Sequence, residues 1–570
     1  MIRSSQGQVP PIILASALAG VLEVLLRSLA PLPYALQATG LALSGLFYSA
    51  AIVPALLASR LAPRRRGTIR LLAGAPFGLL ALNLLLAFGE TSRPLVVGLA
   101  IDAAVCVGAA IVAFANRSLL AGAIVSCLVA ATGLRWSAPS TAVAAVPGPS
   151  VLMVVLDTTT ASHLSAYGYD RETSPSLAAL ARRGLIYRRA ISPAAWTIPA
   201  HASIFSGRYP SQLGFQGFGF SAPDAGSIAT DLARSGRPAF GISANPLVPR
   251  QPLLRAGFDE LWSARRLTRP APRRFAEALF LHFLRESSFA PGEQVTDLAL
   301  DWVDRLAPRG RPWFLFLNYM EAHAPYDPPR PEREHFAAGV DPDDVAPQLD
   351  YDSGRRPLTP RAVTAMRALY DAEIATLDRA VERLLGGLAK RGYDERNLLL
   401  VVTADHGEAL GEHGLVGHLR GLPEGVLHVP LLVSGPGVQA GEVTEPVQTV
   451  QLRATLRRLL GLEDLPGVAP ALPPWGVTPP LVITEHPEVP FTREALRALA
   501  TREGDPWRGD WVAVERAGTK VIFDGRGHGQ TFRLADDPGE MHPRPLDDAL
   551  DLVRDYEAWR RTTSRDGTAR

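Results

Sequence analysis

Five long apolar runs crowd the first 134 residues and constrain the fold of this chain more than any other feature. They lie at about 10–30, 36–58, 71–88, 94–114 and 118–134. Each run approaches the roughly 20 residues that an α-helix needs to cross a bilayer. A signal peptide has one short apolar core before its cleavage site, so five runs do not fit one. The sequence therefore predicts a transmembrane domain of five helices over residues 1–134.

Arginines between these runs set the predicted orientation. The segment SRLAPRRRGTIR at 59–70 carries five arginines. By the positive-inside rule such a loop stays in the cytoplasm. Counting the crossings from this loop places everything beyond about residue 135 on the outer side. We therefore expect an integral protein of the cytoplasmic (inner) membrane that contacts membrane lipids and has an extracytoplasmic soluble part.

The composition narrows the chemistry of that soluble part. The formal net charge of +2 over 570 residues gives no support for a nucleic-acid partner. The two cysteines, Cys106 and Cys127, both precede residue 135. Beyond that point the sequence excludes an internal disulfide, a thiolate metal site and a cysteine nucleophile.

Short apolar runs predict a buried sheet. Residues 135–149 are small and contain proline, which is typical of a linker. The runs beyond them are continuously apolar and lie between helical stretches such as 174–183 and 361–391, a pattern typical of parallel strands buried on both faces. The four clearest runs are 151–156, 313–317, 398–402 and 429–433. The alternation predicts an α/β domain over 150–475 whose sheet carries helices on both faces.

The pattern of the chain changes beyond residue 475. Residues 511–515 and 520–523 have the alternation of a short hairpin, and another strand pattern lies near 531–534. We therefore expect a small C-terminal subdomain with antiparallel strands over residues 476–570.

Acidic residues and histidines follow three of the predicted strands. Asp157 follows the first strand, Glu321 and His323 follow the second, and Asp405 and His406 follow the third. In open α/β sheets, ligands bind beyond the carboxyl ends of the strands. A single Asp in such a place is commonplace and often caps a helix. Acidic residues and histidines after three strands together indicate a metal ion at the edge of the sheet.

The segment from Ala195 to Gly207 has the signals of a helix. Thr197 is a good N-cap, Pro199 suits the first turn and Gly207 suits the C-terminal stop. The plainer interpretation is an ordinary capped helix. The functional one is that the free backbone N–H groups attract a phosphate or sulfate ester, and that a metal beside Thr197 turns its hydroxyl into an alkoxide nucleophile. The residues alone leave both interpretations open.

Four segments, in the expected order, resemble the sulfatase family of the alkaline phosphatase superfamily. They are VVLDTTTASHLSAYGYDRETSPSLAALARRGLIYRRA, WTIPAHASIFSGRYP, NYMEAHAPYDPP, and TADHGEALGEHG with the following GHLRGLPEGVLHVPLLVSGPG. The resemblance covers roughly residues 150–440, and a late segment, LADDPGEMHP, also looks like the family. It implies a sulfatase-like (alkaline phosphatase-like) fold for the α/β domain.

The resemblance also implies roles for particular residues. Asp157, Thr197, Asp405 and His406 would be the metal ligands, and Thr197 would also be the nucleophile. His323 and His418 match positions that hold the anionic group of the substrate or protonate the leaving oxygen, and His201 falls among the substrate-binding positions. For each of these three histidines, the role of an ordinary hydrogen-bonded residue stays open.

Departures from the family pattern bear on the chemistry. Sulfatases convert a Cys or Ser in a C/S-x-P-x-R pattern to formylglycine, whereas this chain reads Thr197-Ile198-Pro199-Ala200-His201, and threonine cannot be converted. The second Asp of the usual Asp-Asp pair is Thr158. The metal site therefore has one carboxylate fewer than in the usual family pattern, and it has His406 beside Asp405. This ligand set favours a single zinc or manganese ion, although calcium and magnesium stay open.

An unmodified threonine resembles the phosphoryl-transfer branch of the superfamily. Lipoteichoic acid synthases and lipid A phosphoethanolamine transferases share the layout of five membrane helices followed by an outward sulfatase-like domain. We therefore expect a membrane-anchored, metal-dependent enzyme that cleaves or transfers phosphate esters, including lipid- or glycan-linked ones, through Thr197. The alternatives are a genuine sulfuric ester hydrolase and a catalytically inactive membrane-bound binding module. If water is the acceptor, the enzyme is a hydrolase. If a hydroxyl group of another molecule is the acceptor, the enzyme is a transferase. The sequence leaves both open.

Overall fold

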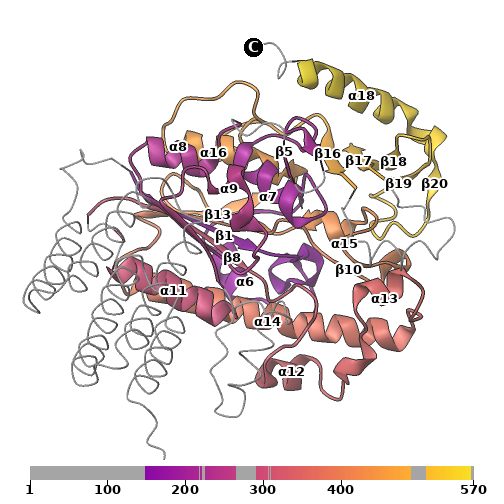
Figure 1. Cartoon of the computed structure of the whole chain (residues 1–570), viewed down its shortest axis with the longest axis horizontal. Helices are drawn as coiled ribbons and strands as arrows, with labels where there is room; N and C mark the ends of the chain where they lie inside the picture. Colours follow the sequence, from indigo (N-terminus) through magenta and orange to yellow (C-terminus); the bar gives the residue numbers. More distant parts are fainter. Residues whose placement is uncertain are drawn as a thin grey trace, which may run out of the picture. The chain divides into compact units, whose positions relative to one another are not determined.

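The computed structural model describes residues 148–565, except 217–218, 221–224, 265–290, 306, 308–309 and 489–508 (Figure 1). The chain divides into two units at Val143 and Ala144, and every described residue belongs to the second unit. The five predicted transmembrane spans lie outside the described residues. No helix in the described part is both long and apolar enough to cross a membrane.

A sheet of eight strands forms the centre of the described part. Its order is β14-β2-β13-β9-β1-β8-β6-β7. The middle strand β1 (Ser150–Leu156) is buried along its whole length and pairs in parallel with β9 (Leu398–Thr403) and β8 (Phe314–Tyr319). Parallel pairing continues to β6 (Ala239–Ser243) and β7 (Glu260–Ser263). The continuous apolar runs thus form doubly buried strands, as predicted.

The apolar run at 429–433 does not form a parallel strand. It contributes to β13 (Leu431–Ser434), which pairs antiparallel with both β9 and β2 (Leu185–Tyr187). The chain between β9 and β13 turns back at the carboxyl edge of the sheet without a crossover to the other edge, so β13 must run in the opposite direction. The outer strand β14 (Gly441–Val443) is again parallel to β2, which makes the sheet mixed.

Helices cover both faces of the sheet, as the alternation predicted. Figure 1 shows α7, α8 and α16 on one side of the strands and α6, α11 and α14 on the other. Their bounds are Thr197–Ser206, Ile228–Arg234 and Leu452–Leu459 for the first group, and Pro175–Ala181, Gly292–Arg305 and Pro360–Ala389 for the second. The longest, α14, begins where the Thr359 side chain caps the N–H of Ala362 and Pro360 occupies the first turn.

The C-terminal part forms a separate antiparallel sheet, as predicted. Its five strands, in spatial order, are β16 (Val482–His486), β17 (Trp511–Arg516), β18 (Thr519–Asp524), β19 (Gly529–Arg533) and β20 (Arg544–Pro545). The β17–β18 hairpin turns at Ala517 and Gly518, whose φ values of 51° and 76° are those of the tight turn that suits twisted strands. Helix α18 (Leu550–Arg565) packs on this sheet.

Candidate active site

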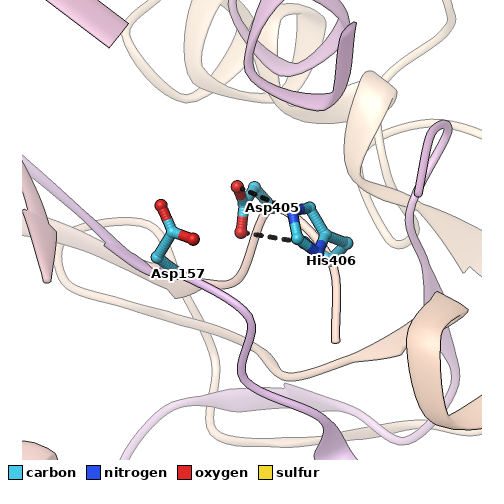
Figure 2. A group of neighbouring side chains, drawn as sticks. All are labelled: Asp157, Asp405 and His406. Carbon is cyan, nitrogen blue, oxygen red and sulfur yellow. Dashed lines mark hydrogen bonds and ion pairs between the residues drawn. The ribbon is translucent and has the colours of Figure 1, made fainter. Parts of the chain in front are cut away.

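Two acidic residues and a histidine converge at the carboxyl edge of the central sheet. Asp157 follows β1, and Asp405 and His406 follow the neighbouring β9 (Figure 2). All three are buried, and one ligand atom from each lies within 4.8 Å of the other two. Parallel strands bring their carboxyl ends to one edge, which is why residues about 250 positions apart meet here.

Two asparagines hold Asp157 in place. Asn245, just beyond β6, donates from Nδ2 to Asp157 Oδ2 at 3.0 Å, and Asn318 on β8 donates to the same oxygen at 3.2 Å. Asn318 Oδ1 accepts from the backbone N–H of Asn245 at 3.2 Å, so the two amides also fix each other. Within the described part, Asp157 Oδ1 has no hydrogen-bond partner. The carboxylate therefore presents one oxygen to the centre of the site.

Asp405 is oriented in the same way. Its Oδ1 accepts the backbone N–H groups of His406 at 2.9 Å and Thr158 at 3.2 Å. Its Oδ2 lies 3.4 Å from His406 Nε2 and 3.3 Å from His201 Nδ1. Thr158 has φ 56°, a left-handed backbone that a β-branched residue rarely adopts. This strained conformation aims its N–H at Asp405, and strain of this kind is concentrated at functional sites.

His406 completes a donor set that suits a metal ion. Its Nδ1 lies 3.0 Å from the carbonyl oxygen of Gly407, which fixes the ring with Nε2 free. In the described part, Nε2 of His406, Oδ1 of Asp157 and Oδ2 of Asp405 are buried without hydrogen-bond partners. Buried polar atoms are otherwise almost always paired. Two carboxylate oxygens and one imidazole nitrogen fit a divalent ion.

The electrostatics of the site agree with this donor set. Burial, and then the charge of Asp405, raise the pKa of Asp157 above its ordinary value. Burial acts in the same direction on Asp405, but the charges of His406 and His201 outweigh it and hold the pKa of Asp405 below its ordinary value. Two buried carboxylates this close are costly as a pair of anions, and a divalent cation removes that cost.

Thr197 stands beside this centre at the start of α7. The extended residue Trp196 is the N-cap, so the prediction that Thr197 caps the helix is wrong by one position. As the first helical residue, Thr197 does not use its hydroxyl to cap the helix. Its Oγ1 lies 3.3 Å from Asn245 Nδ2, the same amide nitrogen that contacts Asp157. The predicted C-terminal stop at Gly207 is confirmed by its left-handed φ of 70°.

His201 lies one helical turn beyond Thr197. Its Nδ1 is 2.9 Å from the carbonyl oxygen of Thr197, and the ring is fully buried with its edge towards Phe316. His201 Nδ1 also lies 3.3 Å from Asp405 Oδ2, so the ring lies between the start of α7 and the Asp405 carboxylate. Its substrate-binding role stays a prediction.

His323 and His418 lie next to the three converging side chains. The ring of His418 is 4.4 Å from that of His406 and 5.3 Å from that of His323, measured between centroids. His323 Nδ1 is 2.6 Å from the carbonyl oxygen of Ala324, and His418 Nδ1 is 2.9 Å from Glu408 Oε1. The structure thus brings together, from five separate segments, the seven residues for which the sequence predicted a catalytic, substrate-binding or metal role. Glu321, which the strand pattern also placed at this edge, is not among the three converging ligands, and its carboxylate accepts the backbone N–H groups of Gly292 and Met320.

The sequence reasoning missed Asn245, Asn318 and Glu408. Asn318 is the first polar residue after the apolar run at 313–317. Its position at the end of a predicted strand was therefore an available signal. Glu408 lies two residues beyond His406 in the same motif. Asn245 follows β6, a short strand that the apolar runs did not predict, so its position left no clear signal.

Comparisons with known proteins agree with this geometry. The family model described as Sulfatase matches residues 149–462, which is more than half of the chain. The chain belongs to the sulfatase family. It is 28% identical over 269 residues to choline-sulfatase of Rhizobium meliloti, a match that covers 44% of this chain and 50% of that protein. It is 22% identical over 463 residues to an arylsulfatase of Clostridium perfringens, which covers 69% and 89% of the two chains.

A solved structure shows the same fold. The phosphonate monoester hydrolase of Agrobacterium radiobacter aligns with a TM-score of 0.54 and 20% identity over 73% of this chain and 95% of that chain. At this identity the likeness establishes the fold alone. The sulfatase-like α/β fold predicted from the sequence is therefore confirmed, and the protein is a sulfatase-family enzyme.

Proposed function

We propose that this protein is a metal-dependent enzyme that cleaves or transfers phosphate esters through Thr197. The observation that carries the proposal is the position of the threonine hydroxyl. Asn245 Nδ2 contacts both Thr197 Oγ1 and Asp157 Oδ2, at 3.3 and 3.0 Å, so the hydroxyl lies beside the carboxylate of the converging donor set. Position 197 holds neither of the residues from which the formylglycine of sulfatases is made.

One divalent ion is part of the proposal. Asp157, Asp405 and His406, with the hydroxyl of Thr197, are the residues that would hold it. When bound, the ion would lower the pKa of the threonine hydroxyl and withdraw charge from the ester. A nitrogen ligand among oxygen ligands favours zinc or manganese over calcium and magnesium.

We propose that the reaction proceeds by two successive displacements at phosphorus. Thr197 Oγ1, already deprotonated, forms a bond to phosphorus while the P–O bond to the leaving group breaks. The imidazole of His323 or His418 gives a proton to the leaving oxygen. Water or an acceptor hydroxyl then attacks the phosphothreonine, releases Thr197 as the alkoxide and returns a proton to the imidazole. The acceptor decides whether the enzyme is a hydrolase or a transferase.

Sulfuric ester hydrolysis is the second candidate. It is favoured by the names of the relatives, a choline-sulfatase and an arylsulfatase. Sulfate and phosphate esters share tetrahedral geometry, so the same donor set accommodates both. Against this candidate stands Thr197, because a sulfated threonine lacks the easy release that formylglycine gives. The third candidate, an inactive binding module, is disfavoured. In the described part, one ligand atom each of Asp157, Asp405 and His406 lacks a hydrogen-bond partner, and the three converge beside the Thr197 hydroxyl, which an inactive module does not require.

The test uses the full chain in detergent with aryl phosphate monoesters, aryl phosphate diesters and aryl sulfates. We expect turnover of a phosphate ester that is lost on chelation, restored by zinc or manganese, and abolished by Thr197→Ala. Thr364→Ala is the matched control, because Thr364 is exposed on α14 and bonds only to the carbonyl oxygen of Pro360. Faster turnover of sulfate than of phosphate esters would favour the second candidate. An active Thr197→Ala variant would refute the nucleophile.

We further propose that residues 1–134 anchor the enzyme in the cytoplasmic membrane with the catalytic domain on the outer face. The support is the set of five apolar runs and the arginine-rich loop at 59–70. Such an anchor suits a lipid- or glycan-linked substrate. The test is protease treatment of intact spheroplasts that express the chain with a C-terminal tag. Loss of the tag from intact cells is expected, and protection of the tag until lysis would refute the orientation.

A further inference from the structure

Glu408 joins the two segments that carry the candidate acid histidines. Its Oε1 lies 2.9 Å from His418 Nδ1, and its Oε2 accepts from the hydroxyl of Tyr326 at 2.9 Å. Tyr326 lies three residues beyond His323. Glu408 is buried, with 1% of the residue exposed. Both oxygens therefore have a partner, and the carboxyl group cannot rotate without breaking one of the two bonds.

This arrangement fixes the orientation of the His418 ring. The two ring nitrogens of a histidine are distinct, and the hydrogen bond that one of them makes sets which nitrogen carries the proton. Glu408 occupies the Nδ1 edge, which leaves Nε2 as the ring nitrogen that Glu408 does not contact, and His418 keeps 7% exposure. The ring also lies 4.4 Å from that of His406, a member of the donor set. Nε2 is thus the nitrogen available to a substrate bound beside His406.

We infer that Glu408 is a positioning residue that holds His418 as the proton donor to the leaving oxygen, which suits the enzyme to esters of aliphatic alcohols. The inference rests on the proposed function and makes the choice between His323 and His418 that the proposal left open. A carboxylate bonded to the second nitrogen of an imidazole holds the ring in one orientation.

The proton balance closes over the two displacements. In the first, Thr197 Oγ1 attacks phosphorus as the alkoxide, its proton having already passed to solvent, and Nε2 gives its own proton to the leaving oxygen as the P–O ester bond breaks. The imidazole keeps the Nδ1 proton that Glu408 accepts. In the second, the Nε2 lone pair takes a proton from the attacking water or hydroxyl as the bond to Thr197 breaks, and Thr197 is released as the alkoxide with which it began. His418 ends the cycle in its starting protonation state.

The chemistry of the leaving group connects this pair to a substrate class. A nitrophenolate anion is stable and leaves without a proton, whereas an aliphatic alkoxide is strongly basic and leaves only as it is protonated. General acid catalysis contributes typically about 100- to 10,000-fold where a proton must be transferred. A buried carboxylate that orients a proton donor is therefore of use mainly with aliphatic leaving groups, such as those of lipids and glycans.

The experiment compares leaving groups in the full chain in detergent. The probes are phosphate esters of 4-nitrophenol, phenol and ethanol, assayed for wild type, Glu408→Gln and His418→Ala. Glu408→Gln is expected to lower kcat/KM about 100-fold for the ethyl ester and less than about 10-fold for the 4-nitrophenyl ester. His418→Ala is expected to give the same dependence on the leaving group. The double variant should be no slower than His418→Ala, because the two residues act as one unit.

Glu485→Gln is the matched control for Glu408→Gln. Glu485 is also a buried glutamate that accepts from a tyrosine hydroxyl, that of Tyr556 at 2.8 Å, and it accepts the backbone N–H of Ser211 at 2.7 Å. Its side chain bonds to Tyr556 and Ser211, which lie outside the site, so its substitution should change all three esters equally or not at all. An equal loss on all esters for Glu408→Gln would show a merely structural role and overturn the inference.

A second variant keeps the inference testable if Glu408→Gln does not fold. Tyr326→Phe removes the other bond of the carboxyl group and leaves the bond to His418, so a smaller loss with the same leaving-group preference is expected. A uniform loss in Tyr326→Phe would again overturn the inference. Thr197→Ala separates the two proposals. If Thr197→Ala is inactive but Glu408→Gln and Tyr326→Phe show the same leaving-group dependence as wild type, only the role of Glu408 fails. If Thr197→Ala is active, the proposed function fails instead.

Discussion

Asn245 offers the sharpest test of how the site is held together, because one amide nitrogen serves two functions. Its Nδ2 donates to the carboxylate of Asp157 at 3.0 Å and lies 3.3 Å from the hydroxyl oxygen of Thr197. The substitution Asn245→Ala removes both contacts and leaves the backbone of the loop free to keep its bond to Asn318 Oδ1. Its consequences divide into an effect on metal affinity and an effect on turnover.

The magnitudes follow from the kinds of bond. A hydrogen bond to a charged carboxylate contributes about 1.5–3 kcal/mol, which corresponds to roughly 10- to 100-fold in an equilibrium constant. Substitutions of residues that orient a metal ligand typically weaken metal affinity by a similar factor, about 10- to 100-fold. The longer contact to the neutral Thr197 hydroxyl contributes about 1 kcal/mol, or roughly fivefold. Asn245→Ala should therefore shift the metal requirement more than it lowers kcat.

The assay titrates metal-free enzyme with zinc or manganese and follows ester turnover. The half-saturating metal concentration should rise about 10- to 100-fold, and kcat at saturating metal should fall about fivefold. Asn397→Ala is the control, because Asn397 is an exposed asparagine whose side-chain bonds lie in a distant turn. A full loss of kcat with an unchanged metal requirement would refute the view that Asn245 acts through Asp157.

Three further predictions concern the metal ligands, the pH dependence and the packing. His406→Ala should lose bound metal on dialysis, measured by elemental analysis, whereas the exposed His335→Ala should keep it. Burial raises the pKa of Glu373 from 4.5 to about 9, so the folded state holds a proton that the unfolded chain releases, and stability should fall as pH rises between these values. Glu373→Gln should therefore raise the thermal midpoint more at pH ~9 than at pH ~6, and an equal gain at both would contradict this. Arg453→Met removes a buried partner of both Asp231 oxygens, at 2.8 and 3.1 Å, and leaves Asp231 only the ion pair with Arg457 among its arginine partners in the described part, so it should cost about 3 kcal/mol in denaturant unfolding.

Much of the site was visible in the sequence because parallel strands impose a simple rule. An apolar run followed by Asp157, and another followed by Asp405 and His406, place their polar residues at one edge once the strands lie parallel. The helix from 197 to 206 was also predictable, because its start and stop signals are local. Its N-cap was displaced by one residue, since Trp196 rather than Thr197 has the extended backbone.

Other features depended on contacts that no local pattern encodes. Asn245 and Asn318 meet Asp157 through the pairing of β6, β8 and β1, which joins residues far apart in the chain. Glu408 was in view within its motif, but its role follows from Tyr326 and His418 approaching it from two sides. The predicted membrane spans and their orientation stay predictions.

The sequence by itself determined which segments become doubly buried strands, and it carried the acidic residues and histidines that follow them. Apolar continuity and capping signals are properties of short stretches, so they can be read without knowing the neighbours. The tertiary structure alone decided that β13 runs antiparallel and that Thr197 turns its hydroxyl towards Asn245. It also decided that, within the described part, one oxygen of Asp157 and one of Asp405 have no hydrogen-bond partner. Strand direction and hydrogen-bond partners are set by long-range packing, in which each buried polar atom must find a partner from elsewhere in the chain.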